Sequence, residues 1–418
     1  MVSTVYIAKN VYGGDGLGRL GDGRVVFVSG AWAGEQVKAE IVEEKRHFVK
    51  ARLVEVVEQS PDRVECAAER VVPGMVYANL SYDGELKAKE GQLREFLERA
   101  RIAVGMPEVG DGADGRGRPS LPTEPFPIGR GTRPACPFNY RNKVVYHFAK
   151  YGNGWRIGYR TEPSHEIVDV AEDPLARPEI NAKLGEIRRA VTTLLTTGPI
   201  QVRKDTERKG SVTVRWTRKT GVKWWVGDAP KDLVLKETTG GLDFEVPADG
   251  FYQVNTDVGD ELAKEVAAEY RKGAAAAPDV LDLYCGVGVL GLCCKAPRLT
   301  GIESGRQAVE FAKRNAAAQG AANARFFSEQ VGRSLKRIRV GATTTVIVDP
   351  PRGGLEPNVP MWLVASNAPR ILYVSCDPAT LTRDLKTLSQ AYAVESVRWF
   401  NMFPRTARFE TLVSLSRR

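Results

Sequence analysis

Short alternations of apolar and polar residues fill the first 58 positions of the chain, with glycine-rich stretches between them. Residues 25–28 and 37–42 have the period of two that is typical of strands. Residues 13–16 and 21–23 are rich in glycine and aspartate, as turns between strands are. Several short strands at this spacing predict a small β-barrel of the OB type over residues 1–58.

The middle of the chain has mixed patterns. Apolar residues recur with a helical period from Gly84 to Arg99, which predicts a helix. A Gly/Pro-rich insertion follows near 105–135 and has too few apolar residues to order itself, so we expect a flexible linker there. Strand patterns return from Arg141 to about Glu245. Together these features predict a small α+β central domain over 59–245.

The last third of the chain, residues 246–418, repeats the order strand, glycine turn, helix. Strands are expected at 280–284, 299–303, 344–348 and 370–374, and helices near 305–319 and 379–390. This alternation predicts an α/β domain with a Rossmann-like, doubly wound parallel sheet. The segment Phe409–Leu415 has the pattern of one more strand without a preceding helix, and we expect it to lie antiparallel at the end of the sheet.

Charge and composition narrow the function. The chain has 418 residues, 43% of them hydrophobic, and a formal net charge of +9 from 60 Lys and Arg against 51 Asp and Glu. Such a surplus favours a polyanionic partner, because phosphate contacts release counterions. A general surface bias is the alternative. No apolar run is long enough to span a membrane and no leader pattern is present, so we expect a cytoplasmic monomer without membrane contacts.

Cysteine and histidine usage limits the chemistry. The six cysteines are scattered and form no CxxC pair, so neither a disulfide framework nor a zinc site is expected. All three histidines lie at or before His165. Acid–base chemistry in the last third of the chain must therefore come from carboxylates, thiols or lysines.

Two basic segments are candidates for RNA contacts. Lys45, Arg46, Lys50 and Arg52 cluster around an aromatic residue in the barrel, which suits either a phosphate backbone or a solvated hairpin face. A second basic and aromatic segment around 211–218 has the pattern of a solvated edge hairpin more than of a base-stacking surface. We expect the barrel to contribute affinity for a nucleic acid rather than chemistry.

A glycine turn follows the first strand of the predicted parallel sheet. Gly286 and Gly288 allow a ligand to approach the backbone closely, although such a pair also occurs in purely structural turns. Glu303 stands 21 residues after Asp282, at the end of the next strand, where a carboxylate binds ribose hydroxyls. An acidic residue at this interval favours a cofactor that contains a nucleoside, such as S-adenosylmethionine.

Two further motifs end parallel strands. Asp349 is followed by Pro350, Pro351 and Arg352, and Cys376 stands at the tip of the next predicted strand. Ligands bind at the carboxyl ends of such strands, so we expect both motifs to face one crevice. A thiol there is able to act as a nucleophile, whereas most lone cysteines are small buried hydrophobes and prolines also favour plain turns.

Taken together and in order, these motifs resemble those of the RNA uracil-5 methyltransferase family over nearly the whole chain. Residues 1–58 resemble its TRAM domain. The other matching segments are Phe251–Asn255 for uracil recognition, Asp282–Gly288 and Asp349–Arg352 for the cofactor, Ser375–Thr380 for the catalytic cysteine and Phe403–Glu410 for the general base. The cysteine motif is highly specific, whereas the glycine motif is shared by many methyltransferases.

The resemblance implies methyl transfer from S-adenosylmethionine to carbon 5 of a uridine in RNA, with ribosomal RNA favoured over transfer RNA. Cys376 would add to carbon 6, Glu410 would remove the carbon 5 proton, and Asp349 would help to hold the ring. The residues expected to bind the cofactor are Gln253, Asp282, Tyr284, Gly286, Gly288, Glu303 and Asp349. Those expected to bind the substrate are Phe251, Gln253 and Arg352.

Two competing functions remain open. One is an amino-group methyltransferase acting on nucleic acid, which would share the cofactor motif but would not need Cys376 or Glu410. The other is a non-catalytic RNA-binding or RNA-folding protein. Intact Cys376, Gln253 and Glu410 argue against the second.

The chain departs from the family pattern in two places. Arg405 and Arg408 stand where the family commonly has histidines, and we expect the two guanidiniums to keep Glu410 ionised. Many relatives carry an iron–sulfur cluster held by four cysteines. The equivalent positions here hold Cys66, Val72, Met75 and Asp173. One thiolate is not enough, so we expect no iron–sulfur cluster and no other metal.

Overall fold

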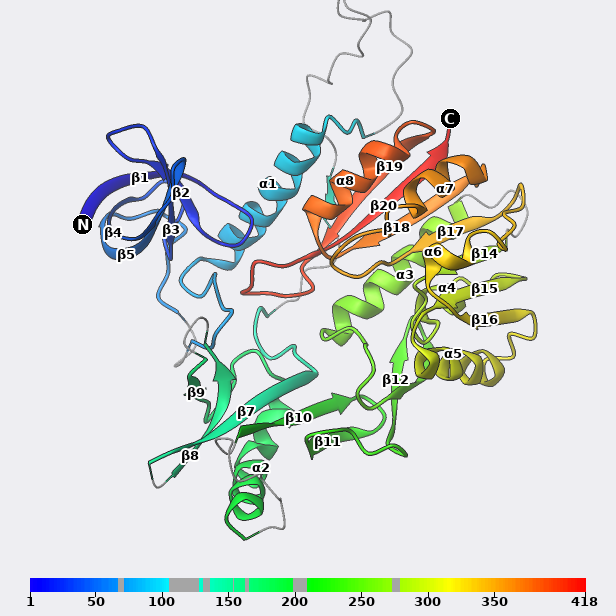
Figure 1. The fold of residues 1–418 in the computed structure, drawn as a ribbon, viewed down its shortest axis with the longest axis horizontal. Coiled ribbons are helices and arrows are strands. Elements are labelled where there is room, and N and C mark those ends of the chain that lie inside the picture. The colour runs from blue at the N-terminus through cyan, green and yellow to red at the C-terminus, as the bar shows by residue number, and fades with distance from the viewer. Residues whose placement is uncertain are drawn as a thin grey trace, which may run out of the picture.

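The computed structural model of the chain describes residues 1–66, 71–104, 128–130, 136–152, 154–161, 165–197, 209–272 and 279–418 (Figure 1). Most of the Gly/Pro-rich insertion expected near 105–135 therefore lies outside the described residues. Within the described part of the chain, no helix combines the length and the apolar character that crossing a membrane requires.

The N-terminal residues form the expected OB-type barrel. Its strands are β1 (Val2–Asn10), β2 (Gly16–Arg19), β3 (Val25–Ser29), β4 (Gln36–Glu44) and β5 (Phe48–Glu58). They close in the order β1-β2-β3-β5-β4, and β3 and β5 pair in parallel. Alternate residues such as Val26 and Val28 point inward and are fully buried, which explains the period of two in the sequence.

A five-stranded sheet and a helix make up the central α+β part. The strands, in sheet order, are β11 (Gly221–Val226), β10 (Lys209–Thr217), β7 (Lys143–Tyr151), β8 (Gly154–Arg160) and β9 (Ile167–Asp169). Helix α2 (Pro178–Thr197) packs against β10 and β11. Of the two strands in the expected edge hairpin, β11 lies at the edge of the sheet and β10 is an internal strand. The guanidinium of Arg215 on β10 is buried and donates hydrogen bonds to three backbone carbonyls.

The C-terminal residues form the expected doubly wound sheet, which has eight strands. In sheet order these are β16 (Ala324–Ser328), β15 (Leu299–Glu303), β14 (Val280–Leu283), β17 (Thr345–Val348), β18 (Arg370–Ser375), β20 (Glu410–Arg417), β19 (Tyr392–Phe400) and β6 (Ile128–Arg130). The first five are parallel to one another. The four strands expected from the pattern are confirmed, and β16 and β19 are additional.

The last strand differs from its expected place. β20 is antiparallel, as expected, but it lies between β18 and β19 rather than at the end of the sheet. An internal strand is covered on both edges and both faces, so its polar residues are buried together with its apolar ones. Residues 410–415 are all buried.

Helices cover both faces of this sheet (Figure 1). One face carries α3 (Thr256–Lys272), α4 (Val289–Cys293) and α5 (Arg306–Ala318), whose apolar residues share one core with the sheet. The hairpin of β12 (Val234–Thr239) and β13 (Leu242–Pro247) packs against α3 and α5. The other face carries α1 (Tyr82–Ala100), α6 (Val331–Ser334), α7 (Val359–Ser366) and α8 (Pro378–Leu388).

Several elements from the expected central domain, 59–245, belong to this C-terminal core, namely α1, β6, β12 and most of β13. Leu86, Leu93 and Leu97 of α1 are buried in the same core as the leucines of α8. Strand β6, from within the expected linker, extends the sheet by pairing with β19. An amphipathic helix must bury its apolar face, but its sequence does not say against which element. Both α1 and β6 therefore pack with the C-terminal sheet, although they precede residue 246.

Candidate active site

A cavity of about 830 Å³ opens at the carboxyl ends of β14, β15, β17 and β18. This is where ligands bind in doubly wound sheets. Of the residues expected from the sequence to form the site, all except Gly288 line it, namely Phe251, Gln253, Asp282, Tyr284, Gly286, Glu303, Asp349, Arg352, Cys376 and Glu410. The sequence reasoning missed Phe403 and counted Arg408 only as a departure, yet both also line the cavity.

Cys376 is held in the turn between β18 and α8. Asp377 caps the helix, and its Oδ1 accepts hydrogen bonds from the backbone N–H groups of Ala379 and Thr380. Pro378 occupies the first helical turn, where its missing N–H has no cost. This cap fixes the backbone on which the Cys376 thiol, itself half-buried, faces the cavity.

The environment of Cys376 favours the neutral thiol. Burial raises the pKa of Cys376 to about 12, and the charges of Glu410 and Asp349 act in the same direction. The Arg352 guanidinium acts against them and lowers that pKa. Formation of a thiolate at neutral pH therefore needs a group that takes the proton, and the two carboxylates are in electrostatic reach.

Two carboxylates share this end of the cavity. Glu410 begins β20 and is buried, and burial together with the Asp349 charge raises its pKa well above the ordinary value. Asp349 follows β17 and is partly exposed to the cavity, and desolvation raises its pKa to about 7. Among the described residues neither carboxylate has a side-chain hydrogen bond, so both are available to a ligand.

The expected effect of the two arginines on Glu410 is wrong. The cation that lowers the pKa of Glu410 is Arg352, against the stronger effect of burial. The guanidinium of Arg405 is buried and donates hydrogen bonds to the carbonyl oxygens of Tyr77 and Leu80, away from the carboxylate. Arg408 pairs with Asp377 instead, at 2.9 Å.

Another part of the cavity, here called the Asp282 end, carries Asp282 near the end of β14. Its Oδ2 accepts a hydrogen bond of 3.0 Å from the Gly291 N–H, while its Oδ1 is buried and has no partner among the described residues. Burial raises the pKa of Asp282 to about 8. A side chain at Gly291 would collide with this carboxylate, since a Cβ there would lie 2.8 Å from Oδ2. A buried acceptor without a donor fits a ligand that brings one.

The glycine turn and Glu303 form the rest of this end. The Glu303 carboxylate accepts hydrogen bonds from the backbone N–H of Gly305 at 2.6 Å and of Gly286 at 3.3 Å. These bonds hold it at the tip of β15, where ribose hydroxyls are bound in such sheets. Gly288 does not line the cavity. It has φ of +87° and packs against Leu292 and Phe326, so its observed contacts are structural.

Gln253 lies on the segment that joins the hairpin β12–β13 to α3. Its backbone carbonyl accepts a hydrogen bond of 2.9 Å from Asn142 Nδ2, which fixes the segment. Gly259 permits the close approach of α3, since a Cβ there would lie 3.0 Å from Gln253 Cβ. Phe251 is 74% exposed at the rim of the cavity, an unusual place for a phenylalanine without a partner to cover it.

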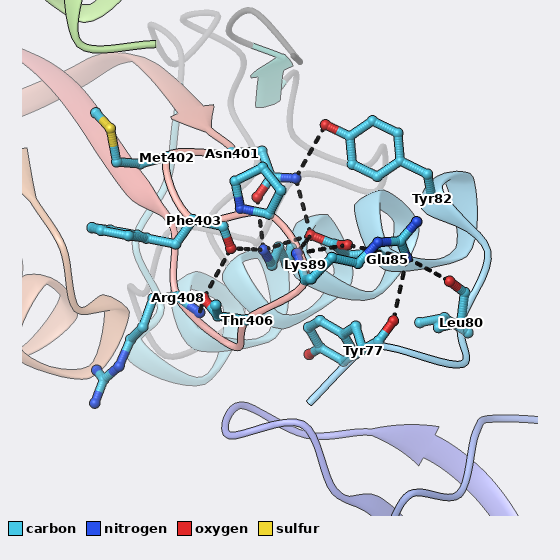
Figure 2. A network of polar contacts seen from close by, with 12 residues as sticks. Tyr77, Leu80, Tyr82, Glu85, Lys89, Asn401, Met402, Phe403, Thr406 and Arg408 are labelled. Atoms are coloured by element: carbon cyan, nitrogen blue, oxygen red, sulfur yellow. Dashed lines mark hydrogen bonds and ion pairs between the residues drawn. The ribbon is translucent and has the colours of Figure 1, made fainter. Parts of the chain in front are cut away.

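The loop between β19 and β20, residues 401–409, is tied to helix α1 by a buried polar network (Figure 2). Lys89 Nζ donates to Glu85 at 2.8 Å, to Asn401 Oδ1 at 2.7 Å and to the Phe403 carbonyl at 3.1 Å. The backbone N–H of Arg405 donates to both oxygens of Glu85. The loop that leads to Glu410 is therefore held from a helix more than 300 residues earlier.

The residues at the four iron–sulfur positions do not fit a cluster. Val72 and Met75 are buried in the core of the central part, and Cys66 packs against that core. Asp173 accepts hydrogen bonds from the hydroxyls of Tyr146 and Tyr159 and from two backbone N–H groups. One thiol and a buried thioether, without a second thiolate at these positions, cannot hold iron and sulfide.

Comparison with known families gives two matches. Residues 231–418 match the family model described as tRNA (Uracil-5-)-methyltransferase, and residues 2–54 match the TRAM domain. An uncharacterized RNA methyltransferase of Gloeobacter violaceus is 30% identical and aligns with 99% of this chain and 96% of its own length. A second one, from Caldanaerobacter subterraneus, is also 30% identical, with 97% of this chain and 95% of that protein aligned.

One solved structure is similar over its whole length. The tRNA (uracil-54, C5)-methyltransferase of Pyrococcus abyssi, in complex with S-adenosyl-L-homocysteine, superposes with a TM-score of 0.70 at 22% identity. The match covers 98% of this chain and 99% of that one. This likeness establishes the same arrangement of barrel, central part and doubly wound sheet.

Proposed function

This chain belongs to the RNA uracil-5 methyltransferase family, and we propose that it methylates carbon 5 of a uridine in RNA through a covalent adduct between Cys376 and carbon 6. The main support is that Cys376, Asp349 and Glu410 line the same end of one cavity. They come from three different strand ends. A plain packed thiol would not need two carboxylates without hydrogen-bond partners beside it.

We infer that S-adenosylmethionine is the methyl donor. When bound, it supplies an electrophilic methyl group. The residues at the Asp282 end fit it, because Asp282 Oδ1 is a buried acceptor without a donor and Glu303 stands at a strand tip suited to ribose hydroxyls. The structure in complex with S-adenosyl-L-homocysteine from Pyrococcus abyssi has the same fold, which supports the inference.

The low reactivity of uracil explains why a thiol and carboxylates are needed at the Cys376 end of the cavity. Carbon 5 is a poor nucleophile until a thiolate adds to carbon 6. The thiolate lone pair forms the S–C6 bond, and the displaced C5–C6 π electrons form an enolate with the C4 carbonyl. Carbon 5 of the enolate then takes the methyl group, and the sulfonium that supplied it would leave as a neutral thioether. Cys376 is the nucleophile in this proposal, and a neighbouring carboxylate takes the thiol proton.

The product forms by elimination. Glu410 takes the proton from carbon 5, the C5–C6 double bond returns and the Cys376 thiolate leaves. Burial raises the pKa of Glu410, which makes the ionised carboxylate a stronger base than an exposed one. Gln253 has both an amide donor and an acceptor with which to read the uracil edge, and Phe251 and Arg352 are placed at the cavity to hold the nucleotide.

The RNA class is a separate part of the proposal. Ribosomal RNA was favoured from the TRAM-like barrel, whereas the Pyrococcus abyssi protein acts, by its name, on transfer RNA. Mapping 5-methyluridine in ribosomal and transfer RNA from cells with and without this protein separates the two. Loss of the modified base from ribosomal RNA is the expected result, and loss from transfer RNA would replace that assignment.

Trapping with RNA that carries 5-fluorouridine tests the mechanism, because fluorine does not leave as a proton does. The native protein should form an adduct that survives denaturation. Cys376→Ala should abolish the adduct, and Cys136→Ala, at an exposed thiol away from the cavity, should not. Glu410→Gln should let the adduct accumulate on unmodified RNA. Methylation without any adduct would instead indicate an amino-group methyltransferase.

A further inference from the structure

One tyrosine of the barrel contacts Arg408, which lines the cavity, and Asp377, which follows Cys376. Tyr12 lies in the turn between β1 and β2, which is closed by hydrogen bonds between Val11 and Asp15 and between Gly14 and Val11. Gln92 of α1 donates a hydrogen bond of 3.1 Å to the Val11 carbonyl and fixes the turn from outside the barrel. The position of Tyr12 is therefore set by both the barrel and α1.

The ring of Tyr12 packs edge-on against two phenylalanines. Its centroid lies 5.7 Å from that of Phe96 on α1 and 6.0 Å from that of Phe409. Phe409 is the residue immediately before Glu410, and it is buried. The barrel thus packs against the backbone that delivers the proposed general base.

The hydroxyl of Tyr12 completes a three-residue cluster. It accepts a hydrogen bond of 2.7 Å from Arg408 Nη1 and donates one of 3.3 Å to Asp377 Oδ2, while Arg408 and Asp377 form an ion pair at 2.9 Å. Burial raises the pKa of Tyr12, so the hydroxyl keeps the proton that it donates. Asp377 directly follows Cys376. One barrel side chain therefore contacts the neighbour in sequence of each proposed catalytic residue.

These contacts matter because the catalytic side chains take their orientation from the backbones that carry them. Among the described residues, neither Cys376 nor Glu410 has a side-chain hydrogen bond, so their positions depend on the backbones that carry them. Asp377 fixes one of these backbones through the helix cap, and Arg408 and Phe409 belong to the other. Small errors in the placement of reacting groups lower rates strongly.

We propose that Tyr12 is a positioning residue for methyl transfer, which holds Asp377 and Arg408 so that Cys376 and Glu410 face the same uracil. The barrel then contributes to the chemistry as well as to RNA affinity, which revises the expectation from the sequence. This inference rests on the proposed function. It concerns the rate of the reaction rather than its type.

The substitution Tyr12→Phe tests it, because the ring contacts with Phe96 and Phe409 remain and only the hydroxyl is lost. Loss of a hydrogen bond to charged partners should lower kcat and the single-turnover rate of adduct formation about tenfold. The Kd for RNA and the thermal unfolding midpoint should stay unchanged. Tyr6→Phe is the matched control, since Tyr6 is 61% exposed on the same barrel, and it should leave kcat unchanged.

Three other outcomes would overturn the inference. Tyr12→Phe with native kcat would show that the hydroxyl has no positioning role. A raised Kd for RNA with native kcat would make Tyr12 an RNA contact only. A lowered melting midpoint in proportion to the lost activity would make its role purely structural. Failure of the native protein to form any adduct would refute the proposed function instead, so the two failures are distinguishable.

Discussion

Lys89 and Asn401 are joined by a hydrogen bond of 2.7 Å, although 312 residues separate them. Lys89 is fully buried and has three acceptors for its three N–H donors, namely Glu85, Asn401 and the Phe403 carbonyl (Figure 2). All three N–H donors of the ammonium group therefore have an acceptor, although burial lowers the pKa of Lys89. The loop that precedes Glu410 therefore depends on a charge buried in α1.

Replacing this lysine should be costly. Lys89→Met leaves the buried Glu85 carboxylate with only the more distant Arg405 guanidinium, at 3.6 Å, among the described residues, and we expect the free energy of unfolding to fall by about 3–5 kcal/mol. Denaturant-induced unfolding measures the loss. Lys87→Ala on the same helix, where the side chain is 66% exposed, should change the free energy by less than about 0.5 kcal/mol. Equal effects of the two substitutions would contradict the role of the network.

The rate of adduct formation should rise with pH. The Cys376 thiol, with a pKa raised by burial to about 12, must give up its proton, and Asp349, with a pKa of about 7, must be ionised to take part in accepting it. Both conditions improve from about pH 6 to about pH 9. Single-turnover trapping with 5-fluorouridine RNA at a series of pH values measures the profile.

Arg352 should influence the pH at which the rate of adduct formation rises. Its charge lowers the pKa values of Cys376 and Glu410, so Arg352→Ala should raise both and shift the rising limb to higher pH. Arg352→Lys retains the charge and should stay near the native profile. If the rate of Arg352→Ala rises over the same pH range as that of the native protein, Arg352 does not influence the ionisation of these groups.

Binding of S-adenosylmethionine should depend on Glu303. Removing an acceptor for ribose hydroxyls with Glu303→Ala should weaken the affinity about tenfold or more, as measured by calorimetry. The control is Glu310→Ala on α5, an exposed carboxylate that pairs with Lys313. Equal affinity of the native protein and the Glu303 variant would reject the assignment of this end of the cavity.

The basic cluster of the barrel is already partly neutralised. Lys45 and Lys50 both pair with Glu43, at 2.8 and 3.0 Å. If this face contacts phosphate, Glu43→Gln frees two cations, so RNA should bind more tightly and the slope of log K against log salt should steepen by about one. Glu55→Gln changes the net charge equally but frees only Lys38, toward the other end of the same β4–β5 pair, and should have a smaller effect. Identical salt slopes would favour a solvated hairpin face.

The purified protein should be colourless. At the positions where many relatives have cluster cysteines, Val72 and Met75 are buried in an apolar core and the Asp173 carboxylate is engaged by two tyrosine hydroxyls. The broad visible absorbance of an iron–sulfur cluster should be absent after anaerobic purification, and iron analysis should find none. A brown protein with about four irons per chain would refute this prediction.

The sequence alone determined the fold class and most of the residues around the cavity. Local periodicity distinguishes barrel strands from the alternating strands and helices of a doubly wound sheet. The carboxyl ends of parallel strands meet at one edge, so motifs after such strands, as at Asp282, Asp349 and Cys376, had to converge there. Glu410 was identified from its motif. Its strand, β20, is antiparallel, so its position in the sheet could not be inferred from the rule for parallel strands.

Only the tertiary structure decided what holds these residues in place. The internal position of β20, the packing of α1 on the C-terminal sheet and the inward turn of Arg405 all depend on contacts between distant segments. Tyr12 and Asp377 are 365 residues apart and meet only in the folded chain. A hydrogen bond between such segments leaves no periodicity in either one, because each residue fits its own turn equally well without the other. That is why the sequence identified the reacting groups but not the tyrosine that we propose to position them.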